Sequence, residues 1–168
     1  MRLMSRSIFV AAALGLAACQ SSHEPSAEAA STITVSVGPC FGFCPVYALS
    51  VDPQGAVSFD GQRHTAVLGE QHRQVQREVY QALAHDLEPF RPTPGTEANV
   101  PCDAAISDTS TYTITWVDPK GGKTVARHHS GCNGGPGQAL DQVLRGLPER
   151  LGVQAWTQQT TRPGVSRG

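Results

Sequence analysis

Hydrophobic and polar residues alternate along several short stretches of the chain, as in β-strands with one buried face. In 32–37 (TITVSV) every second residue is apolar. The same period recurs in 46–51, 56–60, 111–118 and 123–129. A further short strand is expected at 65–68, after a turn at Asp60-Gly61. Two segments with proline and glycine, Asp52-Pro53-Gln54-Gly55 and Asp118-Pro119-Lys120-Gly121-Gly122, predict tight turns between strands.

Two longer stretches have the period of amphipathic helices. In 71–90 apolar residues recur at every fourth position, and Pro89 and Pro92 are expected to end this helix. In 136–151 leucine and valine form one stripe. Pro148 within this stretch predicts a kink or a break.

Together these elements predict a single α+β domain over 32–156. The expected architecture is an antiparallel sheet built from two hairpin or meander units, with two helices packed on one side, in the order ββα-ββα. The connection 91–107 has no period and three prolines, and such long loops are either functional or without fixed structure.

A weak internal repeat relates the two halves at an offset of 65 residues. A duplicated ββα unit would explain it, and so would the general similarity of any two hairpin–helix units. The matched strand residues are Tyr47 with Tyr112, Leu49 with Ile114, and Val51 with Trp116.

The first residues have the pattern of an exported, lipid-anchored protein. Arg2 and Arg6 precede an apolar run that is too short to span a membrane, which predicts a signal peptide over 1–18. The run ends in Leu16-Ala17-Ala18-Cys19, which resembles the bacterial lipobox. This resemblance implies that Cys19 carries diacylglycerol and becomes the mature N-terminus. The alternative is an ordinary signal peptide cut nearby, which would leave Cys19 as an unpaired thiol.

The segment after Cys19 is small and polar, and it predicts a lipidated tether over 19–31. Gln20 stands where an inner-membrane retention signal would have Asp, so the lipobox resemblance implies an outer-membrane location facing the periplasm. Residues 157–168 are polar and aperiodic, and they predict a disordered tail.

The charge of the chain argues against nucleic acid as a partner. The sequence has 13 Lys and Arg against 14 Asp and Glu, so removal of Arg2 and Arg6 leaves 11 against 14 and a net charge of about −3. No basic cluster follows, and nucleic-acid binding needs one. The expected partners are the membrane, through the lipid at Cys19, and a protein of the cell envelope.

Four further cysteines, Cys40, Cys44, Cys102 and Cys132, are expected to form disulfides, because the periplasm is oxidising. Closing the loop between Cys40 and Cys44 would stabilise the fold by roughly 2 kcal/mol, and closing the one between Cys102 and Cys132 by roughly 3.5 to 4 kcal/mol. Crossed pairings between the two sets remain open.

The spacing Cys40-x3-Cys44-Pro45 resembles the copper-binding motif of thioredoxin-fold assembly factors, in which a distant histidine completes the site. His128 or His129 would be that ligand. Those motifs lead into a helix, whereas Pro45 leads into a strand pattern, which favours a disulfide. A zinc site at His128-His129 is disfavoured because neighbouring strand residues point to opposite faces, so we expect one inward and one solvated histidine.

No catalytic site is evident in the sequence. The chain has no serine in a Gly-x-Ser-x-Gly setting, and Asp103 and Asp108 have no obvious basic partner. We therefore expect no catalytic residues, metal or cofactor, and we favour a non-catalytic binding or structural module of the cell envelope. The alternative function is a periplasmic copper-binding or thiol-redox protein that uses Cys40 and Cys44.

The segment CFGFCPVYALSV from Cys40 to Val51, followed by Gly55 and Gly61, resembles a bacterial domain family of unknown function, number 6438. The resemblance extends through Asp108 to about residue 156. Its members are typically exported and have no assigned activity, so it implies a type of domain and a location but no reaction.

Overall fold

A computed structural model describes residues 30–160 of the 168-residue chain. The predicted signal peptide, the lipid site at Cys19 and the tether up to residue 29 lie outside the described residues, as does 161–168 of the predicted tail. Within the described part, no helix is both long and apolar enough to cross a membrane.

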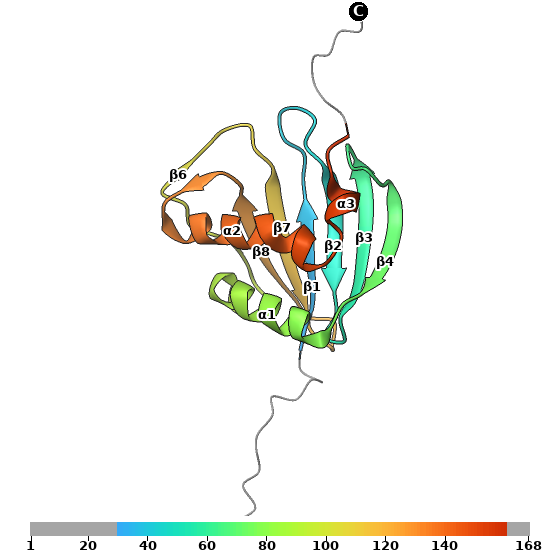
Figure 1. Cartoon of the computed structure of the whole chain (residues 1–168). Helices are drawn as coiled ribbons and strands as arrows, with labels where there is room; N and C mark the ends of the chain where they lie inside the picture. Colours follow the sequence, from blue (N-terminus) through green and yellow to red (C-terminus); the bar gives the residue numbers. More distant parts are fainter. Residues whose placement is uncertain (1–29, 161–168) are drawn as a thin grey trace, which may run out of the picture.

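A seven-stranded sheet forms the body of the domain, in the order β4-β3-β2-β1-β7-β8-β5 (Figure 1). Neighbouring strands run antiparallel, except that β5 pairs parallel with β8. The strands are β1 (Thr32–Val37), β2 (Val46–Val51), β3 (Ala56–Arg63), β4 (Gly69–Gln74), β5 (Glu97–Asn99), β7 (Thr111–Val117) and β8 (Lys123–His129). A second, two-stranded sheet pairs β6 (Ala104–Ala105) with β9 (Cys132–Asn133).

Two helices, α1 (Arg77–Leu87) and α2 (Gly135–Arg150), lie on the same face of this sheet (Figure 1). Short helical segments follow each of them, η2 (Glu88–Phe90) and α3 (Gln154–Thr157). The predicted α+β class, with both helices on one side, is confirmed.

The core lies between β1 and its neighbours on one side and the two helices on the other. Alternate residues of β1 point inward because a strand turns successive side chains to opposite faces. Each fully buried leucine or isoleucine contributes roughly 2 kcal/mol of hydrophobic stabilisation. The inward residues of β1 and the helix residues that cover them are Ile33, Val35, Val37, Tyr80, Leu83, Leu87, Leu140, Leu144 and Leu147.

The internal repeat reflects the two sides of β1. Tyr47 of β2 and Tyr112 of β7 both pair with Val37, and the other matched residues likewise share a partner on β1. However, β3 and β8 continue the sheet in opposite directions while both helices cover the same face. The two units are therefore related as mirror images, which no rotation superimposes, and this arrangement favours general similarity over duplication.

The helix predicted over 71–90 is wrong at its start. Gly69–Gln74 is instead the edge strand β4, and α1 begins at Arg77. Every residue of β4 is exposed, so its sequence carries no burial period, and pairing with β3 decides its conformation. The strand predicted at 65–68 is also wrong, because β3 continues through Gly61 to Arg63 and the turn follows it.

Three smaller predictions also differ from the structure. The long connection contains β5 and β6, which add to existing strands. Pro148 does not break α2, which continues past it to Arg150. At the predicted tail, Thr157 belongs to α3, and the N–H of Thr160 donates to the carbonyl of His64 at 3.2 Å. Residues 157–160 are therefore part of the fold.

Candidate functional site

The loop between β1 and β2 is closed by a disulfide between Cys40 and Cys44, whose Cα atoms are 5.7 Å apart. The N–H of Phe41 in this loop donates to the carbonyl of Asp108 at 3.2 Å. Gly42 has a φ of 143°, in the region that favours glycine. The loop is thus constrained from within by the disulfide and fixed to a segment far away in the sequence.

This loop carries the most exposed large apolar side chain among the described residues, Phe41, which is 88% exposed. Phe43 is partly exposed and packs edge-on against His64, with ring centroids 5.3 Å apart. Leu68 and Ile106, in neighbouring loops, are also exposed. The loops that carry these residues, between β1 and β2, β3 and β4, and β6 and β7, lie at the end of the sheet away from the beginning of β1 (Figure 1). We call residues 38–45, 64–68 and 105–110 the distal end.

A pocket of about 360 Å³ lies at the distal end, on the helix-covered side of the sheet. We call it the tyrosine pocket, because Tyr47 and Tyr112 reach it from either side of Val37. Its lining residues are Val37, Cys44, Pro45, Tyr47, Asp108, Thr109, Ser110, Tyr112, Ser130 and Thr157.

Both phenols of the tyrosine pocket are neutral at physiological pH. Burial raises the pKa of Tyr47, and the nearby Tyr112 raises it further. Burial also raises the pKa of Tyr112, with a smaller contribution from the Asp141 carboxylate that Arg145 opposes. Protonated phenols donate and accept hydrogen bonds.

The second disulfide, between Cys102 and Cys132, attaches the long connection to β9. Beside it, His128 is buried, and its Nε2 lies 2.7 Å from Oδ1 of Asp141 on α2. The other carboxylate oxygen of Asp141 accepts the N–H of Cys132 at 2.8 Å. A Cβ on Gly137 would come within 2.8 Å of the Cys132 sulfur, so glycine permits this close approach of the helix.

Asp141 belongs to no motif in the sequence. It could have been recognised as an acidic residue directly after Leu140, on the buried face of a helix, where a charged side chain needs a partner. His129 is exposed on the opposite face from His128, and its Nδ1 lies 3.0 Å from Oγ1 of Thr109. The prediction of one inward and one solvated histidine is confirmed.

The structure does not assemble the copper site of the alternative hypothesis. Cys40 and Cys44 are bonded to each other, whereas copper binding needs them as thiolates. His128 faces Asp141, and His129 contacts Thr109. Within residues 30–160, no three His, Cys, Asp or Glu side chains are grouped so that they could hold a metal ion.

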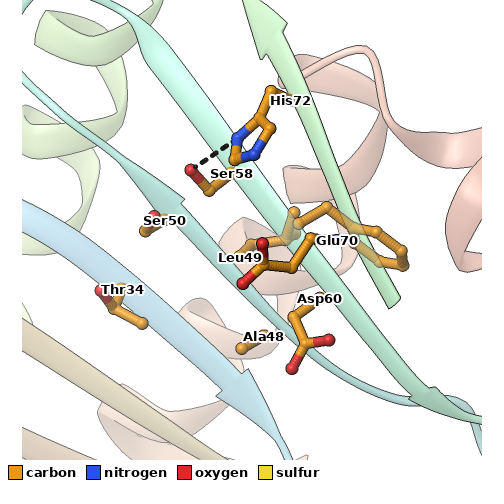
Figure 2. Close-up of a pocket in the computed structure, with 9 residues that line it drawn as sticks. Thr34, Ala48, Leu49, Ser50, Ser58, Asp60, Glu70 and His72 are labelled. Carbon is orange, nitrogen blue, oxygen red and sulfur yellow. Dashed lines mark hydrogen bonds between the residues drawn. The ribbon is translucent and has the colours of Figure 1, made fainter. Parts of the chain in front are cut away.

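A second concavity, of about 210 Å³, lies on the sheet face that the helices leave open (Figure 2). Here Oγ of Ser58 lies 3.2 Å from Nδ1 of His72 on the neighbouring strand. Asp60 and Glu70 are directly opposite each other, so like charges meet at one side of this groove. The sequence pattern places residues 71–74 in a helix and so does not predict this pairing of Ser58 with His72.

A serine beside a histidine can act as nucleophile and base. Such a site also needs donors for the developing oxyanion. Ser58 lies on β3, which is paired on both sides, so the backbone N–H groups of this strand serve the sheet. The backbone N–H groups beside Ser58 are therefore not available as oxyanion donors.

Comparison with known proteins finds one family model, described as Domain of unknown function (DUF6438), which matches residues 31–149. No curated protein matches the chain. The matched range contains both disulfides, the distal end and the whole of the large sheet, and it stops just before the end of α2.

Proposed function

The chain belongs to a family of domains of unknown function, DUF6438, and we propose that it is a lipid-anchored, non-catalytic binding module of the cell envelope. The observation that carries this proposal is that the exposed large apolar side chains of the described residues, Phe41, Phe43, Leu68 and Ile106, all stand on loops of the distal end. Apolar residues scattered singly over a surface are ordinary, whereas a cluster at one end indicates an interaction site.

The beginning of β1 and the distal end lie at opposite ends of the large sheet (Figure 1). The described chain enters β1 at Thr32, and the strand ends at Val37 beside the Cys40–Cys44 loop. Lipid at Cys19 would hold the molecule through the tether 19–31, at the beginning of β1. The distal end would then face away from the membrane, towards a partner protein of the envelope.

The disulfide loop suits a binding role because it is ordered before a partner arrives. The Cys40–Cys44 bond and the hydrogen bond from Phe41 to Asp108 restrict the loop. A preorganised loop loses less conformational entropy on binding than a flexible one. Phe41, which is exposed on this loop, would fill an apolar pocket of the partner, as aromatic anchors do at interfaces.

Two variants test the two parts of this proposal. Cys19→Ala is expected to release the protein from membranes washed in high salt, because the lipid is the proposed anchor. Retention of the variant on washed membranes would show that the anchor is elsewhere.

For the distal end, a photo-crosslinking residue is placed at Phe41 and, as a control, at Gln54, which is exposed in the opposite turn. Cells expressing each full-length protein are irradiated, and adducts are resolved by mass. We expect a discrete envelope-protein adduct from position 41 that position 54 does not give. The same adducts from both positions, or none from 41, would contradict a partner at the distal end.

A further inference from the structure

Four hydroxyl groups in the tyrosine pocket have no hydrogen-bond partner within residues 30–160. Tyr47 and Ser110 are each only 8% exposed. By contrast, the buried hydroxyl of Tyr80 donates to the carbonyl of Ser31 at 2.6 Å. Tyr112 and Ser130 are half-buried, and none of the four hydroxyl oxygens is sealed inside the protein, so all four are available to donors and acceptors that enter the pocket. The four residues are Tyr47, Ser110, Tyr112 and Ser130.

The walls of the pocket are held in place by contacts outside it. The Tyr47 ring packs against Phe59, with ring centroids 5.7 Å apart, and Phe59 packs against Trp156 at the same separation. On the opposite wall, the N–H of Ser130 donates to the carbonyl of Ser110 at 2.9 Å. The Tyr47 ring and the backbone that carries Ser110 and Ser130 are thus held in place by the fold itself.

Asp108 lies at the exposed rim of the same pocket. Its φ of 66° is in the left-handed region, which is uncommon for residues other than glycine and recurs at functional sites. Its carbonyl accepts the N–H of Phe41, so the disulfide loop helps to hold this conformation. Asp108 is thus the one acidic residue of the lining, and its carboxylate accepts the hydroxyl of Ser107 at 3.4 Å.

The composition of the lining restricts the chemistry of the ligand. No lysine or arginine lines the pocket, so an anion would lose water without gaining a cationic partner. A single carboxylate is too few for calcium, which takes six to eight oxygen ligands. Hydroxyl groups both donate and accept, and they match a ligand whose own groups do both. Val37 and the two tyrosine rings add apolar surface.

We propose that the tyrosine pocket binds a neutral saccharide ring, whose hydroxyls meet the four unpartnered hydroxyls while its C–H face covers the aromatic and apolar surface. The volume of about 360 Å³ is near the lower limit for small-molecule pockets and suits one sugar unit of a glycan. This inference deepens the proposed binding function of the distal end and rests on it.

The test uses the full-length protein, purified in a detergent without a sugar headgroup. Methyl glycosides of glucose, galactose, mannose and N-acetylglucosamine are titrated at millimolar concentrations by calorimetry, with saturation-transfer NMR as a second measurement. Methyl glucuronide supplies an anionic comparison and choline a cationic one. We expect at least one neutral glycoside to bind, and to bind more tightly than either charged probe.

Tyr47→Phe and Ser110→Ala each remove one unpartnered hydroxyl and keep the packing of the fold. Each is expected to weaken glycoside binding about tenfold, the effect of one lost hydrogen bond to a buried group. Tyr80→Phe removes a buried hydroxyl outside the pocket and is expected to leave binding unchanged. Near-ultraviolet circular dichroism of all three variants reports whether they remain folded.

Absence of glycoside binding by the folded wild-type protein would overturn this inference. Unchanged binding by Tyr47→Phe and Ser110→Ala would also overturn it, since the sugar would then lie elsewhere, and so would preferential binding of choline or glucuronide. The crosslink from Phe41 separates these results from the proposed function. If position 41 gives the crosslink but no glycoside binds, only the proposed ligand class is wrong. If position 41 gives no crosslink and no glycoside binds, the proposed binding module itself is contradicted.

Discussion

The two ends of the sheet are built by different kinds of interaction. At the end where β1 begins, two hairpins turn through the same local pattern, Asp-Pro-x-Gly. Oδ1 of Asp52 accepts the N–H groups of Gln54 and Ala56, both at 2.9 Å. Oδ1 of Asp118 accepts the corresponding groups of Lys120 and Gly122, at 2.8 and 2.9 Å. A carboxylate and a glycine within five residues thus complete each turn.

At the distal end, by contrast, distant parts of the chain hold one another. The N–H of Gly38 donates to the carbonyl of Thr111 at 2.8 Å, and that of Phe41 donates to Asp108. Ala105 of the distal end pairs with Cys132, and the adjoining Cys102–Cys132 bond joins residues 30 positions apart in the sequence. The exposed apolar side chains and the unpartnered hydroxyls lie at this end, as expected if binding groups stand on loops that a rigid scaffold positions.

The largest expected loss in the free energy of unfolding comes from removing the disulfides. Replacing Cys102 and Cys132 together by serine should lower the free energy of unfolding by about 4 kcal/mol, because the closed loop is long. Replacing Cys40 and Cys44 together should cost about 2 kcal/mol. Denaturation in urea, followed by fluorescence, measures both.

Thiol titration of denatured wild-type protein accompanies this measurement, and paired cysteines should give no free thiols at positions 40, 44, 102 and 132. Equal losses from the two double variants would show that loop length does not govern the effect. Reactive thiols at Cys40 and Cys44 together with bound copper would instead support the metal-binding alternative.

A smaller effect is expected from the tyrosine pocket at alkaline pH. The pKa of Tyr47 is raised in the folded protein, so an unfolded chain loses this proton first as the pH rises above about 10. The stabilisation is complete below that pH and is lost as the pH rises towards the folded pKa, by at most about 1.4 kcal/mol per pH unit. Urea midpoints measured across this range should fall less steeply for Tyr47→Phe, and parallel curves would contradict the role of Tyr47.

The smallest effect is expected at the local turns. Asp52→Ala and Asp118→Ala each remove the acceptor of two exposed backbone hydrogen bonds, and each should lower the free energy of unfolding by about 1 kcal/mol. The double variant should show the sum, since distant sites are additive. A marked difference between the two single variants would show that tertiary contacts also support one turn.

The sequence alone determines the elements whose signals are local. The boundaries of Thr32–Val37 and Lys123–His129 follow from alternation, and the two Asp-Pro-x-Gly turns from residues that satisfy their own backbone. The α+β class follows from the change of period between strands and helices. The cysteines of the two disulfides could likewise be identified, although not their pairing.

Only the tertiary structure decides which elements become neighbours. Gly69–Gln74 is a strand because the edge of β3 is there to pair with it, since its own residues are all exposed and carry no period. Because β1 lies between β2 and β7, Tyr47 and Tyr112 lie on either side of Val37. Because α2 packs near β8, Asp141 meets His128. An alternating pattern fixes which face a side chain occupies but not which strand lies beside it, so the tyrosine pocket could not be found from the sequence.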